Sequence, residues 1–307
     1  PNWNCQYNSR LLPLYRRLIR AIREVDPNHV IILEGVHWAT DFSVFEDFTQ
    51  KEAANNIVLE FHKYWNDPDE ESLASFVETA KRLNVPLWMG EGGENNLQWY
   101  TYAFPMYERL GIGWCFWAYK KMEVPNSPVT FEMPEGWDRI TAYLDGGERP
   151  APEAAQVIFD RFLNCISHGE YHPEIICALT RRPPLEIPAG AYDAEDIQSR
   201  RSAGAVFRRT SKAALLFADG HTGKADWRRY GGEAQPEDQK ILLCLREGDR
   251  IGYRVENPEE KKLRIDVHSY GDGTLNVQNM TAQQGLVWVS CNSGIINVES
   301  LHITIEE

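Results

Sequence analysis

The feature that most constrains the fold is an alternation of strand and helix patterns over the first 120 or so residues. Short apolar runs ended by glycine or polar residues lie at 29–33, 56–61, 87–89 and 111–117. Amphipathic helical patterns lie at 11–25, 68–83 and 97–110. Continuous apolar runs indicate strands buried on both faces, and strands alternating with helices indicate right-handed parallel crossovers. The chain is therefore predicted to begin as an α/β protein, with four units that would make half of an eight-unit barrel.

The C-terminal part has a different pattern. Two further helical stretches, 136–144 and 152–166, are expected to close the first domain, and the proline-containing, turn-rich segment 167–186 is predicted to be a linker or docking segment. From 187 onward, short β-like runs, beginning with 205–209, are separated by Gly, Asp and Asn at roughly hairpin spacing. The predicted domains are thus 1–166, 167–186 and 187–307, the last an all-β sandwich of jelly-roll type.

Composition excludes several classes of partner. The net charge of −13 and the pI of about 5.2 argue against nucleic acid and anionic membranes. No apolar run approaches the ~20 residues of a membrane span. Ten Trp and 13 Tyr are compatible with a neutral polymer such as a polysaccharide.

The cysteines and the N-terminus carry little functional information. None of the six cysteines has the C-x-x-C spacing of a zinc or redox site; Cys165 and Cys177 could form a disulfide, but unpaired thiols fit equally well. The sequence begins with Pro1 and shows no signal-peptide pattern, so we expect a piece of a longer chain whose localisation is unknown.

One strand end stands out chemically. The apolar run at 87–89 is followed by Gly90-Glu91-Gly92-Gly93, which places a carboxylate where the active sites of α/β barrels are built. Flanking glycines leave room for a ligand to approach this carboxylate closely. The alternative is an acidic residue that caps the next helix, a role that Glu94 could also fill.

Three strand-end motifs in order resemble a known family. His62-Lys63-Tyr64, then Gly90-Glu91-Gly92, then the segment 113–117 (GWCFW) resemble the C-terminal half of a glycoside hydrolase family 5 barrel over about residues 1–144. The resemblance implies strands five to eight of a (β/α)8 TIM barrel and a retaining endo-β-1,4-glycanase of the cellulase type. Its substrate would be a polysaccharide or oligosaccharide of the β-glucan or β-mannan class, and its location secreted or at the cell surface.

The resemblance also implies roles for individual residues. Glu91 falls on the nucleophile, His62 and Tyr64 on the family's histidine and tyrosine of strand six, and Trp117 on the sugar-stacking tryptophan of strand eight. Tyr64 would hydrogen-bond the Glu91 carboxylate. Trp38, Trp65 and Trp99 are further substrate-binding candidates, for outer subsites. Glu34, Asn95 and Lys120 lie near the same rim and could contact sugar hydroxyls, but ordinary capping or surface roles are the more common ones for such residues. No metal cluster is visible, and retaining hydrolysis needs no metal or other cofactor.

The sequence departs from the family in one respect. The family's acid/base glutamate lies in an Asn-Glu-Pro motif that closes strand four, and this sequence starts at Pro1. We therefore expect the acid/base just upstream of Pro1, and a chain of these residues alone is expected to be inactive. Two alternatives stay open: a non-catalytic carbohydrate-binding protein with a remnant barrel, and a chain completed by a separate polypeptide.

The β-rich tail loosely resembles carbohydrate-binding modules of the family 6 type. The segments 192–196, 250–255 and 263–267 carry this likeness. It implies sugar binding through exposed aromatic residues such as Trp227, Tyr230, Tyr270 or Trp288. An equally acceptable alternative is a sandwich that only packs against the barrel and stabilises it.

Overall fold

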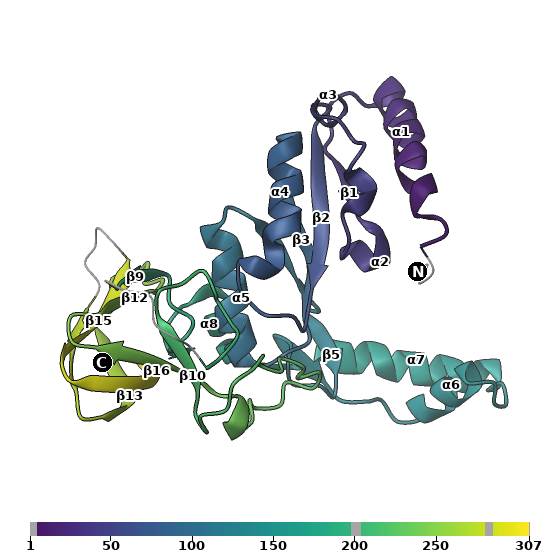
Figure 1. Cartoon of the computed structure of the whole chain (residues 1–307). Helices are drawn as coiled ribbons and strands as arrows, with labels where there is room; N and C mark the ends of the chain where they lie inside the picture. Colours follow the sequence, from purple (N-terminus) through teal and green to yellow (C-terminus); the bar gives the residue numbers. More distant parts are fainter. Residues whose placement is uncertain (1–4, 198–203, 280–284, 307) are drawn as a thin grey trace.

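A parallel sheet with flanking helices, a helical arm and a β-rich C-terminal part make up the chain (Figure 1). The computed structural model describes residues 5–197, 204–279 and 285–306. None of the helices within these ranges has the length and apolar character needed to cross a bilayer.

The N-terminal part contains a four-stranded parallel sheet in which the strands follow one another in chain order. Its strands are β1 (Ile31–Glu34), β2 (Ile57–Lys63), β3 (Leu87–Gly93) and β4 (Gly113–Trp117). Each of the four predicted apolar runs thus forms a strand, and the α/β character of this part is confirmed.

Helices pack on one face of this sheet. The long helices are α1 (Asn8–Val25), α4 (Ala74–Leu83) and α5 (Leu97–Arg109), and the short ones between β1 and β2 are α2 (Val36–Ala39) and α3 (Gln50–Ala53). Leu12, Phe76 and Phe104 from the long helices share a buried cluster with Leu59 and Met89 from the strands. Burying a side chain of this size stabilises the fold by about 1.5–3 kcal/mol.

The opposite face of the sheet is open. Ile32 and Glu34 of β1 and Cys115 and Trp117 of β4 are exposed there. Sheets made only of parallel strands are normally covered on both faces. This sheet therefore presents a polar and partly apolar surface where such sheets usually carry a second layer.

The helices at 136–144 and 152–166 were expected to close the first domain, and this prediction is wrong. Helices α6 (Trp137–Leu144) and α7 (Pro152–Ser167) instead project away from the sheet as an arm beside β5 (Lys120–Met122) (Figure 1). Their aromatic residues pack on one another, with the rings of Trp137 and Phe162 stacked at 4.7 Å. The arm packs partly on itself but leaves Leu144, Phe159 and Leu163 exposed.

The segment predicted as a linker or docking segment contains a short strand and a helix, and both pack on other elements of the chain. It contains β7 (Glu170–Tyr171), which pairs with β6 (Val129–Phe131), and α8 (Pro173–Thr180), which packs on α5. Arg181, which follows α8 and is only 2% exposed, donates to the backbone carbonyls of Thr101 and Ala191 and forms a 3.0 Å ion pair with Asp193. These bonds join α5 directly to the β-rich part.

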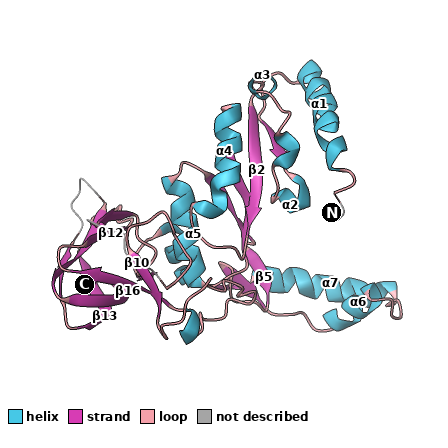
Figure 2. Ribbon diagram, viewed as in Figure 1, coloured by secondary structure: helices cyan, strands magenta, loops and turns pink. Residues whose placement is uncertain are grey.

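The C-terminal part is β-rich, as predicted, and consists of two antiparallel sheets (Figure 2). One sheet contains β8 (Leu185–Pro188), β10 (Ala214–Phe217), β11 (Ile241–Arg246), β13 (Leu263–Gly271) and β16 (Ile295–Ile305). The other contains β9 (Ala194–Asp196), β12 (Arg250–Arg254), β14 (Thr274–Gln278) and β15 (Leu286–Ser293). Residues 205–209 are not a strand, contrary to the prediction; Ala205 only forms an isolated bridge to Gly223. Both cysteines of the suggested disulfide, Cys165 and Cys177, are free thiols.

Candidate active site

Strand β2 builds one side of the candidate site. Side chains alternate along it, so Glu60 and His62 point to the open face of the sheet, as does Tyr64 directly after the strand, while Phe61 and Lys63 point to the helices. Phe61 is fully buried, and Lys63 Nζ lies 5.0 Å from the centre of the Phe76 ring in α4. Burial lowers the pKa of Lys63 to about 8. The polar row on the open face is therefore backed by a tightly packed apolar layer.

A bulge in β3 aims Glu91 at this row. The pairing register of β3 shifts on both sides: Met89 pairs with Phe61 and Trp114, whereas Gly92 pairs with Lys63 and Phe116. Simple alternation would put Glu91 on the same buried face as Met89. The extra residue of a bulge re-aims the side chain that follows it, and Glu91 accordingly pairs with His62 and reaches the open face.

The three residues singled out from the strand ends lie together. The Tyr64 hydroxyl donates a 2.8 Å hydrogen bond to Glu91 Oε2, and His62 Nδ1 lies 3.4 Å from the same oxygen. Burial, followed by the hydrogen bond to Glu91, raises the pKa of Tyr64 far above its usual value. Tyr64 therefore keeps its proton and is a donor that orients the Glu91 carboxylate.

Glu60 extends this network and was missed by the sequence analysis. Its Oε1 lies 3.3 Å from His62 Nε2, so the imidazole sits between two carboxylates. Burial and then the charge of Glu34 raise the pKa of Glu60, and the contact with His62 opposes this shift. The sequence does carry a signal for Glu60: it is an acid inside an apolar run, and it lies two residues before His62, so its side chain is on the same face of the strand as His62.

Gly90 creates the space that Glu60 occupies. A Cβ atom at position 90 would lie 1.7 Å from Glu60 Oε1 and 2.7 Å from Glu60 Cγ. Gly93 has a φ of +148°, and a Cβ there would lie 2.3 Å from the Trp117 carbonyl oxygen. The glycines around Glu91 thus allow a neighbouring carboxylate and the end of β4 to approach β3 closely.

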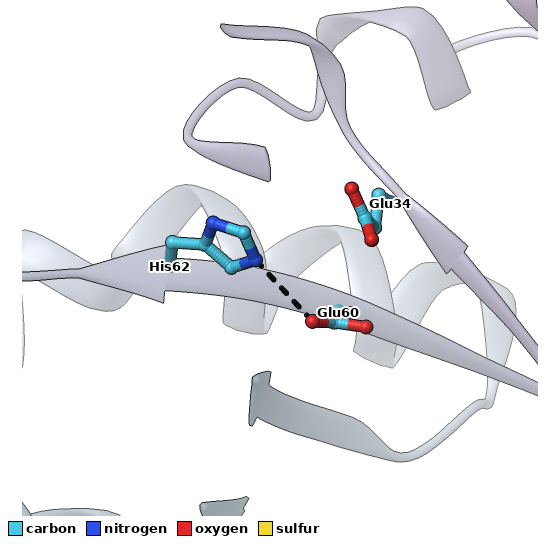
Figure 3. Close-up of side chains that lie close together, drawn as sticks. All are labelled: Glu34, Glu60 and His62. Carbon is cyan, nitrogen blue, oxygen red and sulfur yellow. Dashed lines mark hydrogen bonds and ion pairs between the residues drawn. The ribbon is translucent and has the colours of Figure 1, made fainter. Parts of the chain in front are cut away.

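Glu34, Glu60 and His62 form a cluster that has the donor set of a metal site. Figure 3 shows the three side chains on the neighbouring strands β1 and β2, and one ligand atom of each lies within 4.8 Å of the others. Two carboxylates and an imidazole could hold a divalent cation. The same contacts also have an ordinary explanation, because the imidazole of His62 interacts directly with the Glu60 carboxylate.

Four aromatic side chains lie at or near the rim. Trp117 at the end of β4 is 48% exposed, and Trp38 in α2 is half exposed. Trp65, next to Tyr64, is partly exposed and is anchored by a 2.9 Å bond from its Nε1 to the Glu94 carbonyl oxygen. Its ring meets that of Tyr230 at 4.7 Å, nearly edge to face. Tyr230 comes from the β-rich part, so both parts of the chain contribute to this rim.

Asn95 and Lys120, two further candidates near the rim, form hydrogen bonds within the protein. Asn95 is 0% exposed, and its side-chain amide donates to the carbonyl oxygens of Tyr64 and Trp227 at 3.1 and 2.7 Å. Lys120 Nζ donates to the Ile166 carbonyl oxygen at the end of α7, at 2.7 Å. Asn95 is therefore not accessible to a substrate, whereas Lys120 is partly exposed and its ammonium group has further donors beyond this bond.

Two tryptophans that were candidates for sugar binding are buried in the interior of the protein. Trp99, a candidate for an outer subsite, is fully buried, and its Nε1 donates to the Asn66 carbonyl oxygen. Trp227, a candidate sugar-binding residue of the β-rich part, is also buried, and its Nε1 donates to Asp67. Tyr270 remains exposed on β13.

Comparison with known proteins links this geometry to one family. Residues 1–123 match the family model of Cellulase (glycosyl hydrolase family 5). A mannan endo-1,4-beta-mannosidase of Cellvibrio japonicus (strain Ueda107) is 23% identical over 130 residues, which cover 39% of this chain and 30% of that protein. The chain thus spans less than a third of the length of this relative.

Solved structures show a partial likeness. The catalytic domain of a mannanase from Streptomyces sp. SirexAA-E shares 18% identity, with a TM-score of 0.34 and coverage of 41% of this chain and 43% of that one. An endo-beta-1,4-glucanase from Xanthomonas axonopodis pv. citri shares 17% identity, with a TM-score of 0.33, and the match covers 47% of this chain and 52% of that one. An endoglucanase of Pseudomonas stutzeri shares 21% identity, with a TM-score of 0.31, and the match covers 34% of this chain and 41% of that one. The family match covers the four parallel strands and the Tyr64–Glu91 pair: residues 1–123 of this chain are similar to glycosyl hydrolase family 5, the cellulase family.

Proposed function

We propose that this chain carries the nucleophile side of a retaining endo-β-1,4-glycanase active site, with Glu91 as the nucleophile. The observation that carries the proposal is the 2.8 Å hydrogen bond from Tyr64 to Glu91 Oε2, on the open face of the sheet and beside exposed Trp117. A nucleophilic carboxylate must be ionised and oriented toward its target. The tyrosine hydroxyl keeps its proton and holds Oε2, so it would orient the carboxylate.

The proposed reaction is a double displacement. An oxygen of Glu91 attacks the anomeric carbon of the sugar, the bond from that carbon to the leaving oxygen breaks, and a second carboxyl group protonates the leaving oxygen. Water, deprotonated by the second group, then cleaves the ester to Glu91. The two carboxyl groups must be about 5–5.5 Å apart, on opposite sides of the scissile bond.

We propose that the second carboxyl group acts from the open side of the sheet, opposite Glu91, where parallel sheets usually carry a further layer. Glu60 is a poor substitute, because the His62 ring separates it from Glu91. We propose that strands β1 to β4 are strands five to eight of a (β/α)8 barrel.

His62 is proposed to position the nucleophile and bind a substrate hydroxyl. Its ring is held between Glu60 and Glu91, at 3.3 and 3.4 Å, and is almost fully buried. A β-linked glucan or mannan is the proposed substrate class, since the relatives named above are endoglucanases and mannanases. Trp117 would stack on a pyranose ring, and Trp38 and Trp65 would contact more distant sugars.

An activated substrate tests the nucleophile without the second carboxyl group. The 2,4-dinitrophenyl β-glycosides of cellobiose and mannobiose release a phenolate that needs no proton. We expect wild-type protein to release one equivalent of phenolate per chain in a burst, and Glu91→Gln to release none. Glu78→Gln, which makes the same change on the exposed side of α4, serves as the matched control and should retain the burst.

The other outcomes decide between the alternatives. An undiminished burst in Glu91→Gln would assign the nucleophile to another residue. No burst in the wild type, together with measurable binding of cellobiose or mannobiose, would favour the non-catalytic carbohydrate-binding protein, which needs only the exposed aromatic rings.

A further inference from the structure

A loop of the β-rich part lies against the candidate active site. This loop, residues 226–233, contains Tyr230, whose ring centre is 4.7 Å from that of Trp65. The Trp65 ring centre in turn lies 5.3 Å from that of Tyr64, and the Tyr64 hydroxyl bonds to Glu91. Direct side-chain contacts therefore lead from Glu91 to a residue of the β-rich part.

Three buried asparagines of the N-terminal part hold the backbone of this loop. Each donates from its side-chain amide to a carbonyl oxygen of the loop: Asn95 to Trp227 at 2.7 Å, Asn126 to Tyr230 at 2.9 Å and Asn96 to Glu233 at 3.0 Å. All three asparagines are at most 5% exposed. The loop is thus bound near its start, in its middle and at its end.

The residues behind the loop are themselves joined by hydrogen bonds. The Tyr100 hydroxyl, in α5, accepts from the Asn95 N–H at 3.0 Å and donates to the Asn126 carbonyl oxygen at 2.8 Å. Gly232 has a φ of +88°, and a Cβ atom there would lie 2.7 Å from Asn126 Cβ, so only glycine allows the loop to approach this closely. The position of Tyr230 is therefore determined by packing and hydrogen bonds.

The segment that carries Trp65 is bound to the β-rich part as well. Trp227 Nε1 donates to Asp67 at 3.1 Å, and Arg209 forms a 2.7 Å ion pair with Glu71. Both acids lie between β2 and α4, in the segment that begins with Tyr64 and Trp65. The two rings thus come from segments that are joined to each other at several points.

Both rings are accessible to a ligand. Tyr230 is 55% exposed and Trp65 is 39% exposed. The planes of the two rings meet at 70°, so the rings form a corner rather than one flat surface. Aromatic rings offer apolar faces to the C–H groups of a pyranose, and a tyrosine hydroxyl can bond to a sugar hydroxyl.

We propose that Tyr230 and Trp65 form an outer subsite of the substrate cleft, so that the β-rich part supplies a substrate-binding residue to the candidate active site. This inference rests on the proposed glycanase function and extends it to the binding of longer β-glucan or β-mannan chains. Tyr230 lies outside residues 1–123, the part that matches glycosyl hydrolase family 5. The β-rich part would then form one wall of the cleft, instead of being a separate binding module or only a support.

Calorimetric titration of the full chain with a disaccharide and a hexasaccharide of each series, cellobiose with cellohexaose and mannobiose with mannohexaose, tests the proposal. We expect the wild type to bind one hexasaccharide more tightly than the matching disaccharide. Tyr230→Ala should reduce this gain in affinity about tenfold, which corresponds to about 1.4 kcal/mol. Tyr230→Phe retains the ring and should keep most of the gain. Neither change should lower the melting temperature, because the side chain is exposed.

Tyr143→Ala is the matched control. It makes the same change at an exposed position of α6, in the projecting arm, and should leave the gain unchanged. The proposal is overturned if hexasaccharides bind no more tightly than disaccharides to the wild type, or if Tyr230→Ala keeps the full gain. A gain that falls equally in Tyr230→Phe or in Tyr143→Ala would also overturn it.

The phenolate burst separates these outcomes from a failure of the proposed function. A burst that requires Glu91, without a gain that depends on Tyr230, would overturn the subsite alone. A gain that depends on Tyr230, without any burst, would support the subsite and contradict the assignment of Glu91 as the nucleophile.

Discussion

Tyr64 donates a 2.8 Å hydrogen bond to Glu91 across two neighbouring parallel strands. The contact depends on two local features: the alternation of β2, which puts Tyr64 on the open face, and the bulge in β3, which brings Glu91 to the same face. The pair therefore arises from the backbone geometry of the strand ends rather than from a flexible loop.

Replacing Tyr64 by phenylalanine should slow the attack by Glu91 without unfolding the protein. A hydrogen bond to a charged group contributes about 1.5–3 kcal/mol, so we expect the rate of the phenolate burst to fall about 10- to 100-fold. Stopped-flow absorbance measures this rate. The melting temperature should change little because the Tyr64 ring is retained. A burst as fast as in the wild type would show that the hydroxyl does not assist Glu91.

Gly90→Ala should disturb the site through Glu60. The new Cβ would lie 1.7 Å from Glu60 Oε1, and overpacking of this kind costs about 1–3 kcal/mol. Gly113→Ala is the matched control, because its Cβ would lie 3.7 Å from the nearest atom, in Trp88. Thermal unfolding measures the stability of each variant, and we expect a clear loss for Gly90→Ala and little for Gly113→Ala.

A double-mutant cycle with Glu60 tests the cause of that loss. Glu60→Ala removes the atoms that clash, so the Gly90→Ala/Glu60→Ala protein should recover most of the stability lost on Gly90→Ala. Additive losses in the double variant would show that Gly90 is needed for another reason.

Asn95→Ala should loosen the joint between the two parts of the chain. The change leaves the carbonyl oxygens of Tyr64 and Trp227 without their side-chain donor, at a cost of about 1–3 kcal/mol in the free energy of unfolding. Asn257→Ala is the control, since its amide bonds to the Lys261 carbonyl oxygen in an exposed turn. Urea unfolding should show a clear loss for Asn95→Ala and little for Asn257→Ala. Equal effects would contradict the structural role assigned to Asn95.

Lys63 should give the protein a pH-dependent stability. Its pKa is about 8 in the folded chain and 10.5 in its reference state, so the unfolded chain binds more protons between these values. The contribution of Lys63 to stability therefore rises as the pH increases from about 8 to 10.5, by at most about 3 kcal/mol.

Lys63→Met isolates this contribution. The variant keeps an unbranched apolar side chain over Phe76, and the difference in unfolding free energy between it and the wild type should shrink as the pH rises through that window. Urea unfolding at several pH values measures this difference. A difference that is independent of pH would contradict the burial of the ammonium group.

The parallel part of the fold was accessible from sequence because its signals are local. Apolar runs such as 56–61, ended by polar or glycine residues, predict strands in any context, and their order predicts parallel pairing. His62 and Tyr64 could be placed near Glu91 because the carboxyl ends of parallel strands meet at one edge of a sheet. The bulge at Gly90 does not follow from the pattern, because it depends on pairing with two neighbours.

The rest could not be predicted because it depends on partners that are distant in the chain. Asn95 and Trp99 lie near strand ends in sequence, but their side chains are buried and bond to remote carbonyl oxygens, such as that of Trp227 for Asn95. The arm formed by α6 and α7 shows the same limit: its helical periodicity was correct, but nothing local indicated that the two helices would pack on each other and project away from the sheet (Figure 1).

The most direct test of the central claim is to identify the residue that becomes covalently attached to a sugar. The protein is incubated with 2,4-dinitrophenyl 2-deoxy-2-fluoro-β-glycosides of the gluco and manno series, whose fluorine slows turnover so that the ester to the enzyme accumulates. Peptide mass spectrometry then locates the adduct. We predict one sugar per chain, attached to Glu91 within the peptide that contains Gly90 and Gly92, and slower labelling in Tyr64→Phe. Attachment to Glu34 or Glu60, or an undiminished adduct in Glu91→Gln, would contradict the assignment of Glu91 as the nucleophile.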